Sequence, residues 1–236
     1  MQHTWVMAMA LKINDTIRAT RVGGRRPLSA IRAIVFHYTA NTGLHATALG
    51  NARYFANGSE GRAASAHFVV DEGDTVYQCV PLDVVAWAVG DGRSGKFGKV
   101  YSNYNTVSIE MVSHTDASGK YYIPEATMRN AARLYQMLLK RLPNVQAAIR
   151  HYDISMKLCP LPLIDEKKWE DFKKLLEEEV DEVVTKAKMI VDGKEIEVER
   201  ILKDGTNYIK IRDIAKALDL DVSNKGNVPI LNHKGG

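Results

Sequence analysis

The chain has 236 residues, of which 45% are hydrophobic, and a formal net charge of +4. This length and composition allow a buried core and fit one medium-sized domain with a small appendage. No apolar run approaches the roughly 20 residues that span a bilayer, and the two cysteines are too few for a secreted disulfide scaffold.

Alternating and apolar stretches in the first half predict the strands of a sheet. Residues 31–36 form an apolar run that ends at His37. Residues 66–70 and 75–80 predict a hairpin, and we expect Gly73 in its turn to supply the unusual backbone angle. Distant side chains can meet where such strands end.

Further elements follow in chain order. Residues 45–56 predict a helix, and residues 90–104, rich in Gly, Ser and Lys, predict a long loop of the kind that is often functional. Residues 106–112 alternate like a strand. The apolar stripe of residues 124–141 predicts a helix that covers a sheet, and residues 147–150 predict a short strand.

The last quarter of the chain predicts a separate small unit. Residues 165–188 have helix-forming character, but their acidic second half is typical of a solvated linker. Residues 189–202 alternate around a central Asp-Gly turn, a second hairpin is expected at residues 203–206, and residues 212–220 predict a helix. We therefore expect three parts: a domain of residues 1–180, a helical linker of residues 181–188 and a module of residues 189–236.

Three side chains predict a metal site. His37 and His151 each follow a predicted strand, and Cys159 is held in place by Pro160. Neutral imidazole and thiolate are zinc ligands, and three protein ligands leave the fourth position open, as in catalytic sites. The alternative stays open, because a lone histidine is more often a surface or satisfied core residue and a lone cysteine behaves as a small hydrophobe. For Cys79, core packing is expected.

Six segments, taken in order, resemble one family. They are residues 34–41, 65–71, 86–92, 105–110, 150–153 and 157–160. The family is that of the zinc-dependent N-acetylmuramoyl-L-alanine amidases, which includes T7-type phage lysozymes and peptidoglycan recognition proteins. The resemblance covers residues 28 to 180 and implies an α/β fold with a mixed central β-sheet flanked by helices.

The resemblance also implies site residues. His37, His151 and Cys159 would hold Zn²⁺. Glu110 would act as general base and then general acid, and Lys157 would stabilise negative charge on the oxygen of the tetrahedral intermediate. The alternative for Glu110 is an exposed strand carboxylate without a catalytic role, and the alternative for Lys157 is an ordinary surface lysine.

Three positions qualify the resemblance. His67 matches a position that is chiefly structural, so we leave it out of the metal set. Ala66 stands where T7-type members have a tyrosine, which makes the mechanism through Glu110 the expected one. Ala88 stands where bacillus-type relatives often have histidine, so a substrate contact from that position is in doubt.

The implied activity is hydrolysis of the amide bond between N-acetylmuramic acid and L-alanine in bacterial peptidoglycan. A phage or prophage endolysin is favoured, because residues 5–11 are too short and lack the basic lead of a secretory signal. The enzyme would then be synthesised in the host cytoplasm and act on the wall after membrane permeabilisation. A host autolysin of the same chemistry and a non-catalytic peptidoglycan-binding protein are the alternatives.

The two ends of the chain suggest further binding partners besides peptidoglycan. Residues 1–32 contain six Lys or Arg and one acidic residue. This basic start could bind anionic wall polymers or be a solvated arm, but it lacks the aromatic residues and motifs of a nucleic-acid site. The last unit resembles copper-amine-oxidase N-terminal-like, or stalk, modules, so wall attachment or self-association is expected of it. No membrane contact is expected.

Overall fold

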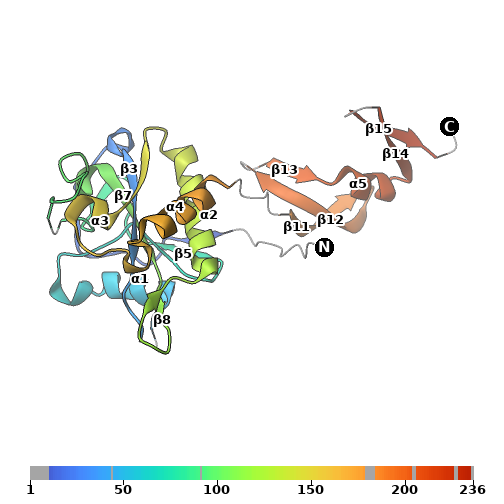
Figure 1. The fold of residues 1–236 in the computed structure, drawn as a ribbon. Helices are drawn as coiled ribbons and strands as arrows, with labels where there is room; N and C mark the ends of the chain where they lie inside the picture. Colours follow the sequence, from blue (N-terminus) through green and yellow to red (C-terminus); the bar gives the residue numbers. More distant parts are fainter. Residues whose placement is uncertain are drawn as a thin grey trace. The chain divides into compact units, whose positions relative to one another are not determined.

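The computed structural model describes residues 11–43, 45–90, 92–178, 184–203, 206–225 and 228–234. The chain divides into two compact units, Leu11–Val180 and a second that contains Asp181–Gly236. None of the helices in these described ranges has the length and apolar character needed to span a bilayer. The ribbon is shown in Figure 1.

The first unit is built on a six-stranded mixed sheet, with strand order β1-β5-β4-β7-β3-β10. Strand β3 runs parallel to both β7 and β10, whereas β4 and β5 form the antiparallel hairpin expected from the sequence. The strands are β1 (Lys12–Asn14), β3 (Ala33–Tyr38), β4 (Phe68–Val70), β5 (Thr75–Gln78), β7 (Thr106–Met111) and β10 (Ala147–Arg150).

Helices cover both faces of this sheet (Figure 1). Helices α2 and α4 pack side by side over the face that carries Phe36, whose ring lies 5.0 Å from that of Phe172. Helix α1 packs against Val69 on the opposite face. The helices are α1 (Ala48–Ala56), α2 (Glu125–Arg141), α3 (His151–Ser155) and α4 (Glu166–Glu177), with short 3₁₀ turns η1 (Leu28–Ala30), η2 (Ser59–Gly61), η3 (Asn103–Asn105) and η4 (Leu161–Leu163). The predicted mixed sheet flanked by helices is confirmed.

Two small sheets complete the first unit, and one predicted turn differs. Strand β2 (Val22–Arg25) pairs with β6 (Val84–Ala86), and β8 (His114–Thr115) pairs with β9 (Tyr121–Tyr122). The expectation that Gly73 has an unusual backbone angle is wrong, because its φ is not positive. Instead the Asp71 carboxylate accepts the Gly73 N–H at 3.0 Å, so a side chain shapes the turn.

The second unit contains a three-stranded antiparallel sheet, one helix and a separate two-stranded hairpin. The Asp192-Gly193 turn lies in the left-handed region, as expected for a tight hairpin. The elements are β11 (Val184–Val191), β12 (Lys194–Lys203), β13 (Thr206–Ile209), α5 (Ile211–Ala217), β14 (Leu220–Lys225) and β15 (Val228–His233). The predicted helix of residues 212–220 therefore extends too far, since Leu220 begins β14.

The prediction of a helical linker at residues 181–188 is wrong for residues 184–188, which belong to β11. Their charges face partners on the neighbouring strand: Lys186 pairs with Glu197 and Lys188 with Glu195, each at 2.7 Å. Charged residues at every second position can form ion pairs across neighbouring strands, and they are equally compatible with a solvent-exposed helix. Composition alone therefore does not distinguish a strand from a helix here. Residues 181–183 lie outside the described residues.

Candidate metal centre

Two adjacent parallel strands bring the two histidines together. His37 lies near the end of β3, and His151 directly follows β10 as the first residue of α3. Arg150 pairs with Phe36 in the parallel strands β10 and β3. The residues that follow them, His151 and His37, therefore lie at the same end of the sheet. The two imidazole rings lie 4.7 Å apart between centroids.

Cys159 joins this pair from the loop after α3. Its Sγ lies 3.7 Å from Nδ1 of His37, and the ligand atoms of Cys159, His37 and His151 all lie within 4.8 Å of one another. Tetrahedral zinc with ordinary Zn–N and Zn–S bonds separates neighbouring ligand atoms by about 3.3–3.6 Å. The donor set therefore fits zinc, and the Sγ–Nδ1 separation is close to this spacing, while ligand atoms at the 4.8 Å limit must draw together to bind one ion. The structure brings together the three residues expected from the sequence.

Backbone contacts fix the cysteine relative to the histidine helix. The Tyr152 N–H donates to the carbonyl of Cys159 at 2.8 Å, so α3 and the loop that returns from it are tied at the ligand itself. Cys159 is 4% exposed, and His37 and His151 are 2% and 1% exposed. The three candidate ligands are thus held in a buried, preformed position.

Glu110 lies beside the candidate ligands. It pairs with His37 across β7 and β3, so both side chains lie on the same face of the sheet, with Oε1 of Glu110 4.0 Å from Nδ1 of His37. Burial lowers the pKa of His37 well below 6.5, and nearby His151 and Lys157 lower it further. This imidazole is therefore neutral, which is the form that binds a metal, and its contact with Glu110 is not an ion pair.

The carboxyl of Glu110 has an unusual proton affinity. Burial raises its pKa to about 8, although the charge of Lys157 acts in the opposite direction. A pKa near the working pH suits a group that must both take and return a proton. Lys157 is exposed, lies two residues before Cys159 and acts electrostatically on both Glu110 and His37. The structure thus places Glu110 beside the candidate ligands and Lys157 in the segment that leads to Cys159.

His67 lies in a separate buried network, consistent with its exclusion from the metal set. Its Nδ1 lies 3.0 Å from the Ser108 hydroxyl, and its Nε2 lies 2.7 Å from the guanidinium of Arg26. Burial, followed by the charge of Arg26, lowers the pKa of His67 to about 3. Arg26 itself is 3% exposed and donates to four backbone carbonyls. It is therefore not part of a solvated basic arm, and nothing in the sequence separated it from exposed Arg25.

Sequence reasoning also missed the buried pair of Arg150 and Asp153. Both side chains are at most 3% exposed, and the guanidinium donates to both carboxylate oxygens of Asp153. Arg150 also donates to the carbonyls of Leu163 and Ile164, which follow Cys159. One side chain thus joins the start of α3, where His151 lies, to the segment beyond the cysteine.

Removal of the Asp153 carboxylate should therefore destabilise the first unit. The Asp153→Ala substitution leaves the buried Arg150 guanidinium with only the exposed carboxylate of Glu166, 2.7 Å away, as counter-charge. Loss of one partner of a buried ion pair costs about 3–5 kcal/mol, and the remaining pair with Glu166 places the expected loss toward the lower end of that range. Urea unfolding of the metal-free protein measures this free energy. The matched control is Asp171→Ala, which breaks exposed ion pairs with Lys167 and Lys174 and should change stability little. Equal effects of the two substitutions would contradict the role given to the buried pair.

Comparison with known proteins places this chain in a family. Residues 27–162 match the model of the Amidase_2 family, described as N-acetylmuramoyl-L-alanine amidase. The chain is 30% identical over 200 residues to the N-acetylmuramoyl-L-alanine amidase CwlL of Bacillus licheniformis, covering 81% of this chain and 53% of the relative. It is 28% identical over 160 residues to the amidase XlyB of Bacillus subtilis strain 168, covering 68% and 46%. The chain thus spans about half the length of these curated relatives.

Solved structures share the fold of the first unit. PlyL aligns with a TM-score of 0.51 and 21% identity over 72% of this chain and 97% of that one. The endolysin amidase LysCS of Clostridium intestinale aligns with a TM-score of 0.51 and 18% identity over the same shares, 72% and 97%. These likenesses show the fold. Because the family model matches more than half of the residues, the chain belongs to the N-acetylmuramoyl-L-alanine amidase family, Amidase_2.

Proposed function

We propose that this protein hydrolyses the amide bond between N-acetylmuramic acid and L-alanine in bacterial peptidoglycan, with Zn²⁺ as cofactor. The observation that carries the proposal is the convergence of His37, His151 and Cys159, with their ligand atoms within 4.8 Å, next to a half-buried Glu110. Membership of the family supports the choice of this bond.

Each residue has a separate task in this reaction. His37, His151 and Cys159 would hold the ion, which when bound supplies Lewis-acid polarisation of the scissile carbonyl and lowers the pKa of water. Glu110 takes a proton from the attacking water and passes it to the leaving nitrogen as the C–N bond breaks. The first products are the lactyl carboxylic acid and a free L-alanine amine, because Glu110 returns to the leaving nitrogen the one proton that it took from water. The acid then gives its own proton to the amine, which leaves a carboxylate and an ammonium group.

Lys157 supports the same step electrostatically. Its ammonium carries the opposite charge to the oxygen that becomes negative when water adds to the carbonyl, and such a fixed charge stabilises the transition state more than the substrate. The effect of Lys157 on the pKa of Glu110 and His37 supports its placement within reach of the reacting atoms.

In the cell, we propose wall lysis by a phage or prophage endolysin. A host autolysin of the same chemistry and a non-catalytic peptidoglycan-binding protein are the alternatives; the presence of Cys159 argues against the latter. Synthesis in the host cytoplasm, contact with anionic wall polymers and self-association through the C-terminal unit stay predictions.

Digestion of purified cell walls tests the activity. We expect the zinc-loaded protein to release new L-alanine amino termini without new reducing sugar ends, and we expect a chelator to stop this release until zinc is restored. Protein that sediments with the walls but releases no amino termini would favour the binding-only alternative. Amino termini of another residue would contradict the assignment of the bond.

A further inference from the structure

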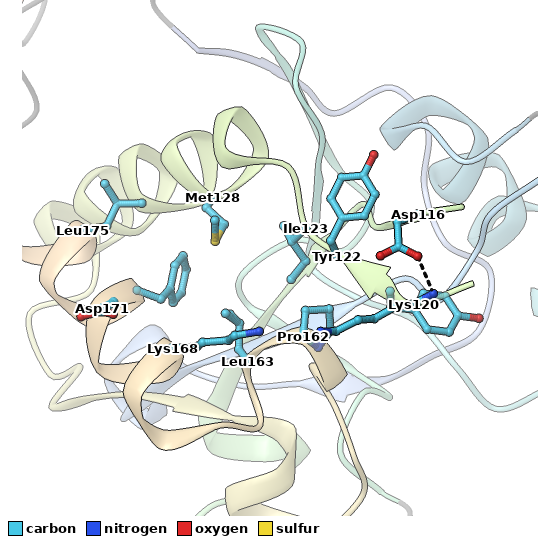
Figure 2. Close-up of a pocket in the computed structure, with 12 residues that line it drawn as sticks. Asp116, Lys120, Tyr122, Ile123, Met128, Pro162, Leu163, Lys168, Asp171 and Leu175 are labelled. Atoms are coloured by element: carbon cyan, nitrogen blue, oxygen red, sulfur yellow. Dashed lines mark hydrogen bonds between the residues drawn. The ribbon is translucent and has the colours of Figure 1, made fainter. Parts of the chain in front are cut away.

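A groove of about 550 Å³ lies outside the candidate metal centre, between the β8–β9 hairpin, the start of α2, η4 and α4 (Figure 2). Its apolar surface includes Tyr122, Met128 and Phe172, which come from three different elements. Such a surface can pack against the apolar part of a ligand, while the polar groups at its edges select the charge of that ligand.

The groove is lined by two carboxylates and two lysines, and they differ in their partners. Asp116 is ionised, and its Oδ1 accepts the backbone N–H groups of Ser118 and Lys120 in the hairpin turn, while Asp171 is paired with two lysines of its own helix. By contrast, the ammonium groups of Lys120 and Lys168 form no ion pair within the described parts of the chain. Figure 2 shows the two side chains extending toward Pro162 from opposite walls. Two cations therefore face one region of the groove.

This groove is connected to the metal centre by short stretches of chain. Turn η4, which contributes Pro162, begins two residues after Cys159. From the other wall, the ring of Tyr121 packs edge-on against Tyr38 with 5.4 Å between centroids, and Tyr38 is the neighbour of His37. The two walls of the groove thus continue into the segments that carry two of the candidate ligands.

We propose that the groove binds a free carboxylate of the peptidoglycan stem peptide through Lys120 and Lys168, an inference that rests on the proposed function. The neutral sugars of the glycan offer no free carboxylate once the lactyl group is amide-linked, so a pair of cations selects the peptide. An extended chain advances about 3.3–3.6 Å per residue. The side-chain and terminal carboxylates of a stem peptide therefore lie on the order of 7–14 Å from the scissile amide, beyond the metal centre itself.

Kinetics on two soluble substrates test the inference. One is a muramyl peptide with free stem carboxylates, and the other is the same compound with those carboxylates converted to carboxamides. We expect the wild-type protein to show a KM about tenfold lower for the free acid, as one or two charge-assisted hydrogen bonds provide. The double variant Lys120→Ala/Lys168→Ala should give equal, high KM values for both substrates, with kcat changed little.

A matched double variant, Lys99→Ala/Lys140→Ala, removes two other exposed lysines and should keep the preference for the free acid. Titration of the free stem tetrapeptide, followed by NMR, measures binding without hydrolysis and so separates this inference from the proposed function. If neither muramyl substrate is cleaved, the proposed function fails. If the wild type does not distinguish acid from amide, if the Lys120/Lys168 variant retains the distinction, or if the free peptide does not bind, the inference is overturned.

Discussion

Replacement of Cys159 by alanine should remove zinc and turnover together. Cys159 is buried, and its Sγ lies 3.7 Å from Nδ1 of His37, so it is the group that converts a pair of imidazoles into a three-ligand site. Loss of a residue that merely orients a ligand costs 10–100-fold in metal affinity, so loss of a ligand should cost more than about 100-fold. Zinc content after dialysis against a weak chelator, measured by emission spectrometry beside L-alanine release, checks this expectation.

Cys79 provides a matched control for the loss of a buried thiol. It is 1% exposed and packs in an apolar cluster with Val69 and Phe55, and burial raises its pKa to about 12, so it stays a thiol. The Cys79→Ala protein should therefore keep its zinc and its activity. A Cys159→Ala protein with a full complement of zinc, or a Cys79→Ala protein that loses zinc, would refute the assignment of the thiolate ligand.

The position of the metal centre could be predicted because it depends on strand ends. An apolar run that stops at His37 and a short strand that stops before His151 are both visible in the sequence, and parallel pairing of β3 with β10 then brings the two residues to one edge. The pairing of His37 with Glu110 follows from the same topology. Local pattern and family resemblance therefore agreed with the tertiary structure at these residues.

Other features could not be predicted, because they depend on contacts between residues far apart in sequence. Arg26 is one of several arginines near the start of the chain, and only the four carbonyls that surround it in the fold distinguish it from the exposed ones. The groove is likewise formed by a hairpin and a helix, so neither Lys120 nor Lys168 differs locally from a solvated lysine. In β11, charge at alternate positions suits an exposed helical surface as well as a strand, and only the pairing with β12 distinguishes the two.

Substitution of Glu110 by glutamine should leave zinc in place but remove most of the turnover. Glutamine has nearly the same size and fits the position opposite His37 in β7, but it cannot take a proton from water or return one to the leaving nitrogen. General acid–base groups contribute about 10²–10⁴-fold to rate, so kcat for L-alanine release should fall within this range. Zinc content and the unfolding transition should stay close to those of the wild type.

The matched control for this variant is Glu72→Gln, which alters an exposed carboxylate paired with His114 at 2.9 Å. It should retain full turnover, because Glu72 is an exposed residue of the turn between β4 and β5, and its ion pair is with His114 rather than with a candidate ligand. A Glu110→Gln protein with turnover within a few-fold of the wild type would exclude Glu110 as the proton carrier. Loss of zinc in that variant would instead assign Glu110 to metal binding, because a group that only transfers protons is not needed to hold the ion.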